Sequence, residues 1–142
     1  MDDLADKLME LLSNKENLET LKLGHVDSIT VFSKCHHGFS YHPTKVNTMN
    51  PTLKFDLLKA QLEACEEIGV RAPVYISAGF DEKDAVEHHD WVRVNPSDIG
   101  KAPDFSRAGY HLMCFNTAYL DKLIAEIEEV MVNYNPCEIF LD

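Results

Sequence analysis

The sequence lacks any long hydrophobic run, and no apolar stretch approaches the ~20 residues of a membrane-spanning helix. Positive charge is also scarce, because 13 lysines and arginines stand against 24 acidic residues and leave a net charge of −11. Nucleic acids and anionic membranes require clustered Lys and Arg. The acidic start MDDLADK is also unlike a signal peptide. We therefore expect no nucleic acid and no membrane among the partners of this chain.

Paired cysteine motifs are missing as well. The four cysteines lie far apart, form no CxxC pair and fall inside or beside apolar segments: Cys35, Cys65, Cys114 and Cys137. This spacing is typical of reduced, buried thiols in a cytoplasmic protein. The sequence therefore predicts a cytoplasmic location. Its 142 residues, 45% of them apolar, are enough for one domain with its own core, which we place at 1–142.

What the sequence does contain is a regular alternation of helical and extended segments. Helices are predicted over 2–13 and 16–24, which together make an N-terminal helical segment, 1–24. Further helices are expected after Asn50-Pro51, as N-cap and first helical position, and after Asn116-Thr117. Glycines at 24 and 69 mark helix ends. The inward face of the last helix is expected to comprise Leu120, Leu123, Ile124, Ile127, Val130 and Met131.

Four strands are predicted between these helices, at 28–33, 72–77, 112–115 and 138–142. Strands that alternate with helices form right-handed βαβ units and a parallel sheet. The sheet could be open and doubly wound, or part of a barrel. A complete (β/α)₈ barrel takes about 250 residues, so four strands would supply about half of one. A half barrel leaves sheet edges unpaired, which favours association, and a homodimer through these edges is one expectation.

Polar side chains stand at the carboxyl end of every predicted strand, where α/β proteins gather their chemistry. Lys34 to His37 follow the first strand, and Ser77 to Asp81 follow the second. Asn116 follows the third strand, and Asp142 ends the fourth. This distribution indicates a functional site at that edge of the sheet.

Two kinds of site are weighed first and disfavoured. A metal centre could use His36, His37 and His42 with Cys35, and with the run His88-His89-Asp90. Adjacent residues on a strand point to opposite faces, however, so these side chains converge only if the chain bends. A metal-dependent hydrolase using His36 and His37 stays as an alternative. A nucleophilic Cys35 beside His36 is discounted, because catalytic partners are rarely neighbours in sequence.

A sugar site fits the same residues better. Imidazoles and a lysine bind hydroxyl groups, and aromatic side chains cover the apolar face of a sugar ring. The loops offer four aromatic residues for such walls, namely Phe39, Tyr41, Phe80 and Trp91. A carboxylate at a strand end, Asp142, suits the nucleophile or base of glycoside hydrolysis.

The segment ITVFSKCHHGFSYHPTKV, residues 29–46, resembles the glycoside hydrolase family 29 motif that reads roughly vlTaKHHDGFalwpSk. The α-L-fucosidases make up this family. RAPVYISAGFD, residues 71–81, is similar to its vglYySl.dW strand, and residues 118–142 are similar to its Y…Q..ELl..Y.p.d.lwfD. A related group of hypothetical glycosyl hydrolases carries KCHHG, PVYIS and FFD at these places. The resemblance covers about residues 18–142.

The resemblance implies the first half of a (β/α)₈ glycosidase barrel acting on a small sugar such as L-fucose or galactose. It implies that Asp142 is the nucleophile of a retaining mechanism and that the histidine pair binds substrate hydroxyls. Cys35 falls on the first family histidine, His36 on the second and His37 on the family aspartate. In the family the general acid/base comes from a later part of the barrel, beyond Asp142. No cofactor or metal is implied.

We therefore expect a catalytic Asp142 and a carbohydrate-binding rim made of Lys34, His36, His37, Tyr41, Trp91 and Asn116. The isolated 142 residues are expected to bind a sugar more readily than they hydrolyse it. A non-catalytic carbohydrate-binding or scaffold half barrel is the main alternative.

Overall fold

The computed structural model describes residues 14–106 and 108–142. The elements are α2 (Lys15–Leu23), β1 (Val31–Lys34), α3 (Leu57–Ile68), β2 (Val74–Ile76), α4 (Glu82–Glu87), η1 (His89–Trp91), η2 (Pro96–Asp98), α5 (Tyr119–Tyr134) and β3 (Ile139–Leu141). The helix predicted over 16–24 is confirmed by α2. The helix predicted over 2–13 lies outside the described residues. None of the described helices is long and apolar enough to cross a membrane.

The three strands form one parallel sheet in the order β1-β2-β3. The parallel α/β architecture is therefore confirmed, but the sheet has three strands rather than four. The strand predicted at 112–115 is wrong. Leu112 and Met113 form isolated antiparallel bridges with Phe80 and Val92 instead. These residues have high β propensity, but they pair with residues of the loop region that follows β2 and are not part of the sheet.

Helix α3 begins later than the sequence predicts, at Leu57 rather than after Asn50-Pro51. Asp56 is the N-cap, and its carboxylate accepts a hydrogen bond from the Lys59 backbone N–H at 2.9 Å. The other carboxylate oxygen of Asp56 accepts from the Tyr134 hydroxyl at 2.8 Å, which ties α3 to the end of α5. The predicted end is confirmed, since Gly69 adopts the left-handed conformation at φ 67°.

Helix α5 buries a narrower apolar face than predicted. Leu123 and Val130 are buried, whereas Ile124 and Met131 are each nearly half exposed. A buried carboxylate, Glu126, occupies the inward face between them. The predicted capping segment is close to the observed start, because the Thr117 hydroxyl oxygen accepts a hydrogen bond from the Tyr119 N–H at 3.3 Å.

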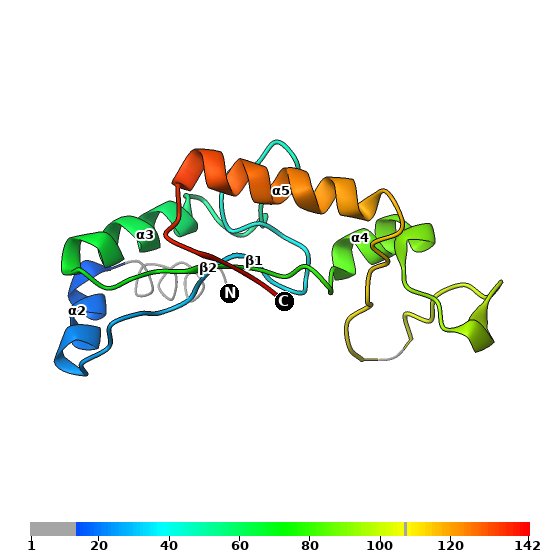
Figure 1. The fold of residues 1–142 in the computed structure, drawn as a ribbon, viewed down its shortest axis with the longest axis horizontal. Helices are drawn as coiled ribbons and strands as arrows, with labels where there is room; N and C mark the ends of the chain where they lie inside the picture. Colours follow the sequence, from blue (N-terminus) through cyan, green and yellow to red (C-terminus); the bar gives the residue numbers. More distant parts are fainter. Residues whose placement is uncertain (1–13, 107) are drawn as a thin grey trace.

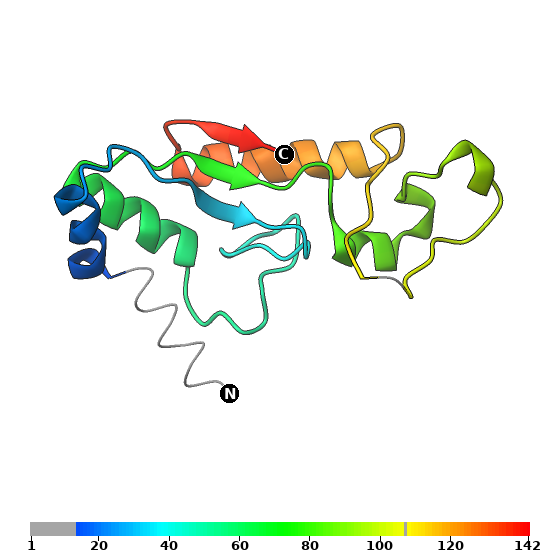
Figure 2. The ribbon, with the colours of Figure 1, turned by 90° about the horizontal axis from the view of Figure 1, so that it is seen from below.

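The strands point toward the part of the chain that holds α4 and the loops around it (Figures 1 and 2). Helix α5 runs beside the sheet in the opposite direction to the strands (Figure 2). Phe32, Tyr75 and Phe140 are paired in register across the three strands, with ring centroids 4.6 and 5.5 Å apart. The carboxyl edge of the sheet and the α4 region therefore meet, and Asp142 and His36 lie near this junction.

Candidate functional site

Asp142 follows β3 directly and is held at the sheet edge by Tyr75 of β2 and by two residues that follow β2. Its backbone carbonyl accepts hydrogen bonds from the Ala78 and Gly79 N–H groups at 2.6 and 2.8 Å. Its side chain accepts from the Tyr75 hydroxyl at 2.7 Å, while the residue as a whole is exposed. Burial and the Asp142 carboxylate raise the pKa of Tyr75 to about 12, so Tyr75 stays a donor at neutral pH. One oxygen of the carboxylate is thus fixed, and the other remains available.

His36 lies beside this pair, with its ring centroid 6.3 Å from that of Tyr75. Its Nδ1 is 2.7 Å from the Ser77 hydroxyl oxygen, and that hydroxyl donates to the Phe80 carbonyl at 2.8 Å. Because the hydroxyl proton of Ser77 is used there, the neutral His36 ring donates from Nδ1. Its Nε2 is then an acceptor, which suits a substrate hydroxyl group.

His37 points to a different set of partners. Its Nδ1 is 3.4 Å from the Cys35 sulfur, and its Nε2 is 3.2 Å from the Tyr110 hydroxyl. The Tyr41 hydroxyl donates to the same sulfur at 2.9 Å. Burial has the largest effect on the pKa of Tyr41 and raises it above its ordinary value, and the Cys35 thiol raises it further. Cys35 therefore contacts His37 and Tyr41 rather than His36, the neighbour weighed as its catalytic partner.

Lys34, expected on the rim, is only 1% exposed. Its ammonium group forms ion pairs with Asp81 at 2.8 Å and Glu126 at 2.7 Å. Burial alone would lower the pKa of Lys34, but the charges of Glu126 and Asp81 outweigh burial and raise it. The structure thus places Lys34 beneath the edge, where it joins β1 to the start of α4 and to α5.

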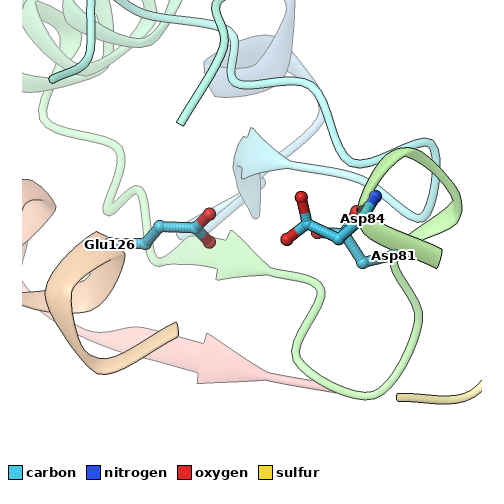
Figure 3. A group of neighbouring side chains, drawn as sticks. All are labelled: Asp81, Asp84 and Glu126. Atoms are coloured by element: carbon cyan, nitrogen blue, oxygen red, sulfur yellow. Dashed lines mark hydrogen bonds between the residues drawn. The ribbon is translucent and has the colours of Figure 1, made fainter. Parts of the chain in front are cut away.

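Three buried carboxylates converge at this position, those of Asp81, Asp84 and Glu126 (Figure 3). This is the only group among the described residues whose ligand atoms lie close enough to hold a metal ion, and it includes none of the predicted histidines. Lys34 bridges Asp81 and Glu126, and Lys122 bridges Asp84 and Glu126. The ammonium groups lie where a cation would bind, so the cluster is a charge-compensated structural network.

The remaining predicted residues have other surroundings. Trp91 stacks on His88 with ring centroids 3.8 Å apart and packs against the core. Asn116 lies in the exposed turn before α5. His42 is 2% exposed, and its two nitrogens are 2.9 Å from the Ser33 hydroxyl and the Pro43 carbonyl. Two loop aromatics reach His36, namely the predicted Phe80, with ring centroids 5.0 Å apart, and Tyr110, at 5.2 Å.

Sequence reasoning missed Tyr75 and Tyr110, and it placed Ser77 at the strand end without giving it a role. Tyr75 is part of the apolar run APVYIS, where a tyrosine looks like core packing. The available signal was its hydroxyl, because a buried phenol requires a hydrogen-bond partner. Tyr110 had no such signal, since only the folded loop brings it to the histidines.

Comparison with known proteins matches residues 13–142 to the family model described as hypothetical glycosyl hydrolase 6. No curated protein sequence matches the chain. The solved structure of α-L-fucosidase isoenzyme 2 from Paenibacillus thiaminolyticus is 50% identical, with a TM-score of 0.85. The match covers 91% of this chain and 20% of that enzyme, so the chain spans about a fifth of its length.

Two more distant structures share the fold. The Thermotoga maritima α-fucosidase in complex with fucose is 22% identical, with a TM-score of 0.61, over 90% of this chain and 28% of the enzyme. The unliganded α-L-fucosidase AlfC from Lactobacillus casei is 22% identical, with a TM-score of 0.62, over 90% of this chain and 42% of the enzyme. The three strands thus match part of a fucosidase catalytic domain.

Proposed function

The chain belongs to the family of hypothetical glycosyl hydrolase 6, and we propose that it carries the nucleophile and part of the sugar-binding edge of a retaining glycosidase acting on L-fucose or a similar small sugar. The observation that carries this proposal is the Asp142 carboxylate, held at 2.7 Å by Tyr75 at the carboxyl edge of a parallel sheet beside His36. The similarity to the Paenibacillus α-L-fucosidase supports the choice of sugar. Galactose is the second candidate.

Each residue has a distinct part in the proposed reaction. The free oxygen of Asp142 attacks the anomeric carbon, and a glycosyl ester forms as the bond to the leaving oxygen breaks. Tyr75 orients the carboxylate by donating to its other oxygen. His36 accepts a hydrogen bond from a ring hydroxyl through Nε2. Protonation of the leaving oxygen requires a second carboxyl group about 5 Å from the nucleophile, a role that we assign to no residue of this chain.

Sugar binding by the 142-residue chain is the first expectation. Isothermal titration should show binding of L-fucose and none of its mirror image, D-fucose. His36→Phe keeps a ring of similar shape but removes the acceptor nitrogen, and we expect it to weaken L-fucose binding about tenfold. His88→Phe is the matched control, because His88 stacks on Trp91 away from the edge. Equal affinity for both enantiomers, or equal effects of the two variants, would contradict the assignment.

A non-catalytic carbohydrate-binding or scaffold role is the second candidate, because the second carboxyl group that glycoside hydrolysis requires is assigned to no described residue. Under that role L-fucose binds but no glycosyl ester ever forms on Asp142. A metal-dependent hydrolase is less well supported, since the two adjacent histidines face different partners.

Three wider features belong to the same proposal. We place the three-stranded sheet in a (β/α)₈ barrel, because its strands and helices superpose on fucosidase catalytic domains. Association of two copies through β1 and β3, the outer strands of the described sheet, would extend it. A cytoplasmic location is consistent with the four free thiols.

A further inference from the structure

A cavity of about 440 Å³ lies among the loops that follow β2. Its walls include Phe80, Val92, Arg93, Asn95, Tyr110 and Leu112. Aromatic and aliphatic surface with a few polar groups is the lining that saccharide pockets use. Phe80 is the one lining residue that the sequence also proposed as an aromatic wall of a sugar site.

Two residues that line the cavity, Tyr110 and Phe80, also contact the histidines of the candidate site. The Tyr110 hydroxyl is 3.2 Å from His37 Nε2, and the Phe80 ring centroid is 5.0 Å from that of His36. A third lining residue, Leu112, packs near Gly79, whose backbone N–H donates to the Asp142 carbonyl oxygen at 2.8 Å. The cavity therefore begins where the sugar-binding edge ends.

The charge of the cavity is opposite to that of the chain. Arg93 is exposed, and no ion pair or hydrogen bond of its guanidinium group is found among the described residues. Within the described part of the chain, the lining of this cavity contains no carboxylate, although Arg93 also lines an adjoining pocket that contains Asp98 and Asp104. The other ionisable group, His111, is engaged by Glu82 at 2.8 Å. A cation without a partner is thus directed to a cavity in a protein whose net charge is −11.

We propose that this cavity binds the saccharide on the leaving-group side of the scissile bond, and that Arg93 selects one with an anionic substituent. The guanidinium group matches the planar, two-oxygen edge of a carboxylate and also binds sulfate. The ligand class is therefore an L-fucoside, or a similar glycoside, of an acidic sugar. The inference rests on the proposed function, because it takes the edge at Asp142 and His36 as the place where the fucosyl ring binds.

The test is a titration of the 142-residue chain with aryl α-L-fucosides whose ring carries a carboxylate, a sulfate ester or a neutral carboxamide, alongside methyl α-L-fucoside. We expect one of the anionic fucosides to bind about tenfold more tightly than the neutral one, and the preferred anion distinguishes an acidic sugar from a sulfated one. In Arg93→Gln this ratio should fall to about one. Lys101→Gln removes a nearby cation that pairs with Asp98 at 2.9 Å, and it should leave the ratio unchanged.

The titration distinguishes a failure of this inference from a failure of the proposed function. If the fucosides bind with no preference for charge, or if Arg93→Gln keeps the preference, the inference is overturned and the proposed function stands. If methyl α-L-fucoside and all aryl fucosides fail to bind, the proposed function is overturned and the inference falls with it.

Discussion

Replacing Lys34 by methionine is expected to lower the unfolding free energy of the 142-residue chain by about 3–5 kcal/mol. The ammonium group is 1% exposed and neutralises Asp81 and Glu126, which are themselves buried. Its removal leaves two carboxylates without their shared counter-charge in a low-dielectric environment. The pKa of Lys34 is raised by these partners, so its contribution is fully present below about pH 10.5 and is lost as pH rises through the folded-state value.

Urea unfolding at pH 7 measures this loss directly. Lys59→Met is the matched control, because Lys59 makes an exposed ion pair with Glu63 at 3.7 Å, and its loss is expected to cost less than about 1 kcal/mol. Equal unfolding midpoints for the two variants would show that Lys34 is solvated and belongs to the rim, as the sequence predicted.

Gly38→Ala is expected to destabilise the chain by about 2–5 kcal/mol for two separate reasons. Gly38 has φ 88°, where a side chain is strained. An added Cβ would also lie 2.2 Å from the Asp81 carboxylate and 2.8 Å from the Lys83 Cβ. The clash displaces the carboxylate that holds Lys34, so the buried network and the loop with the histidine pair are disturbed together.

Gly100→Ala separates the two causes. Gly100 has nearly the same backbone angle, φ 85°, but nothing lies within 4 Å of an added Cβ. This variant carries the strain alone, about 1–2 kcal/mol. Thermal unfolding of both variants gives the difference, which is the contribution of the clash. Equal losses would mean that Asp81 does not pack against Gly38.

Local features of the fold could be predicted from the sequence because their causes are local. The left-handed glycine at the end of α3 and the β-branched runs of β1 and β2 needed only neighbouring residues. The strand predicted at 112–115 failed because β propensity does not specify a partner, and the available partners were loop residues after β2. The start of α3 was misplaced because Asp56 is fixed partly by Tyr134, a residue of another helix.

In the candidate site, too, some features could be predicted from neighbouring residues and others depend on distant ones. Position at a strand end brought Asp142 and His36 to one edge, as the pattern of polar residues predicted. Lys34 was placed at that edge too, yet its partner Asp81 is 47 residues away and draws its side chain inward. The rim role of Trp91 stays a prediction, and its ring stacks on His88, three residues earlier in the chain. The long-range contact of Lys34 is set by the fold and leaves no local pattern.

The nucleophilic role of Asp142 is the central claim, and covalent labelling with 2-deoxy-2-fluoro-α-L-fucosyl fluoride tests it most directly. Fluoride leaves without protonation, so the reaction needs a nucleophile but no general acid. The bond from the anomeric carbon to fluorine breaks as an ester bond to Asp142 forms. Mass spectrometry should find one sugar per chain, on the peptide that contains Asp142. Asp142→Asn should abolish the label, and Tyr75→Phe should slow it about tenfold. A chain that binds L-fucose yet stays unlabelled, or is labelled on another carboxylate, would contradict the account and leave the carbohydrate-binding role.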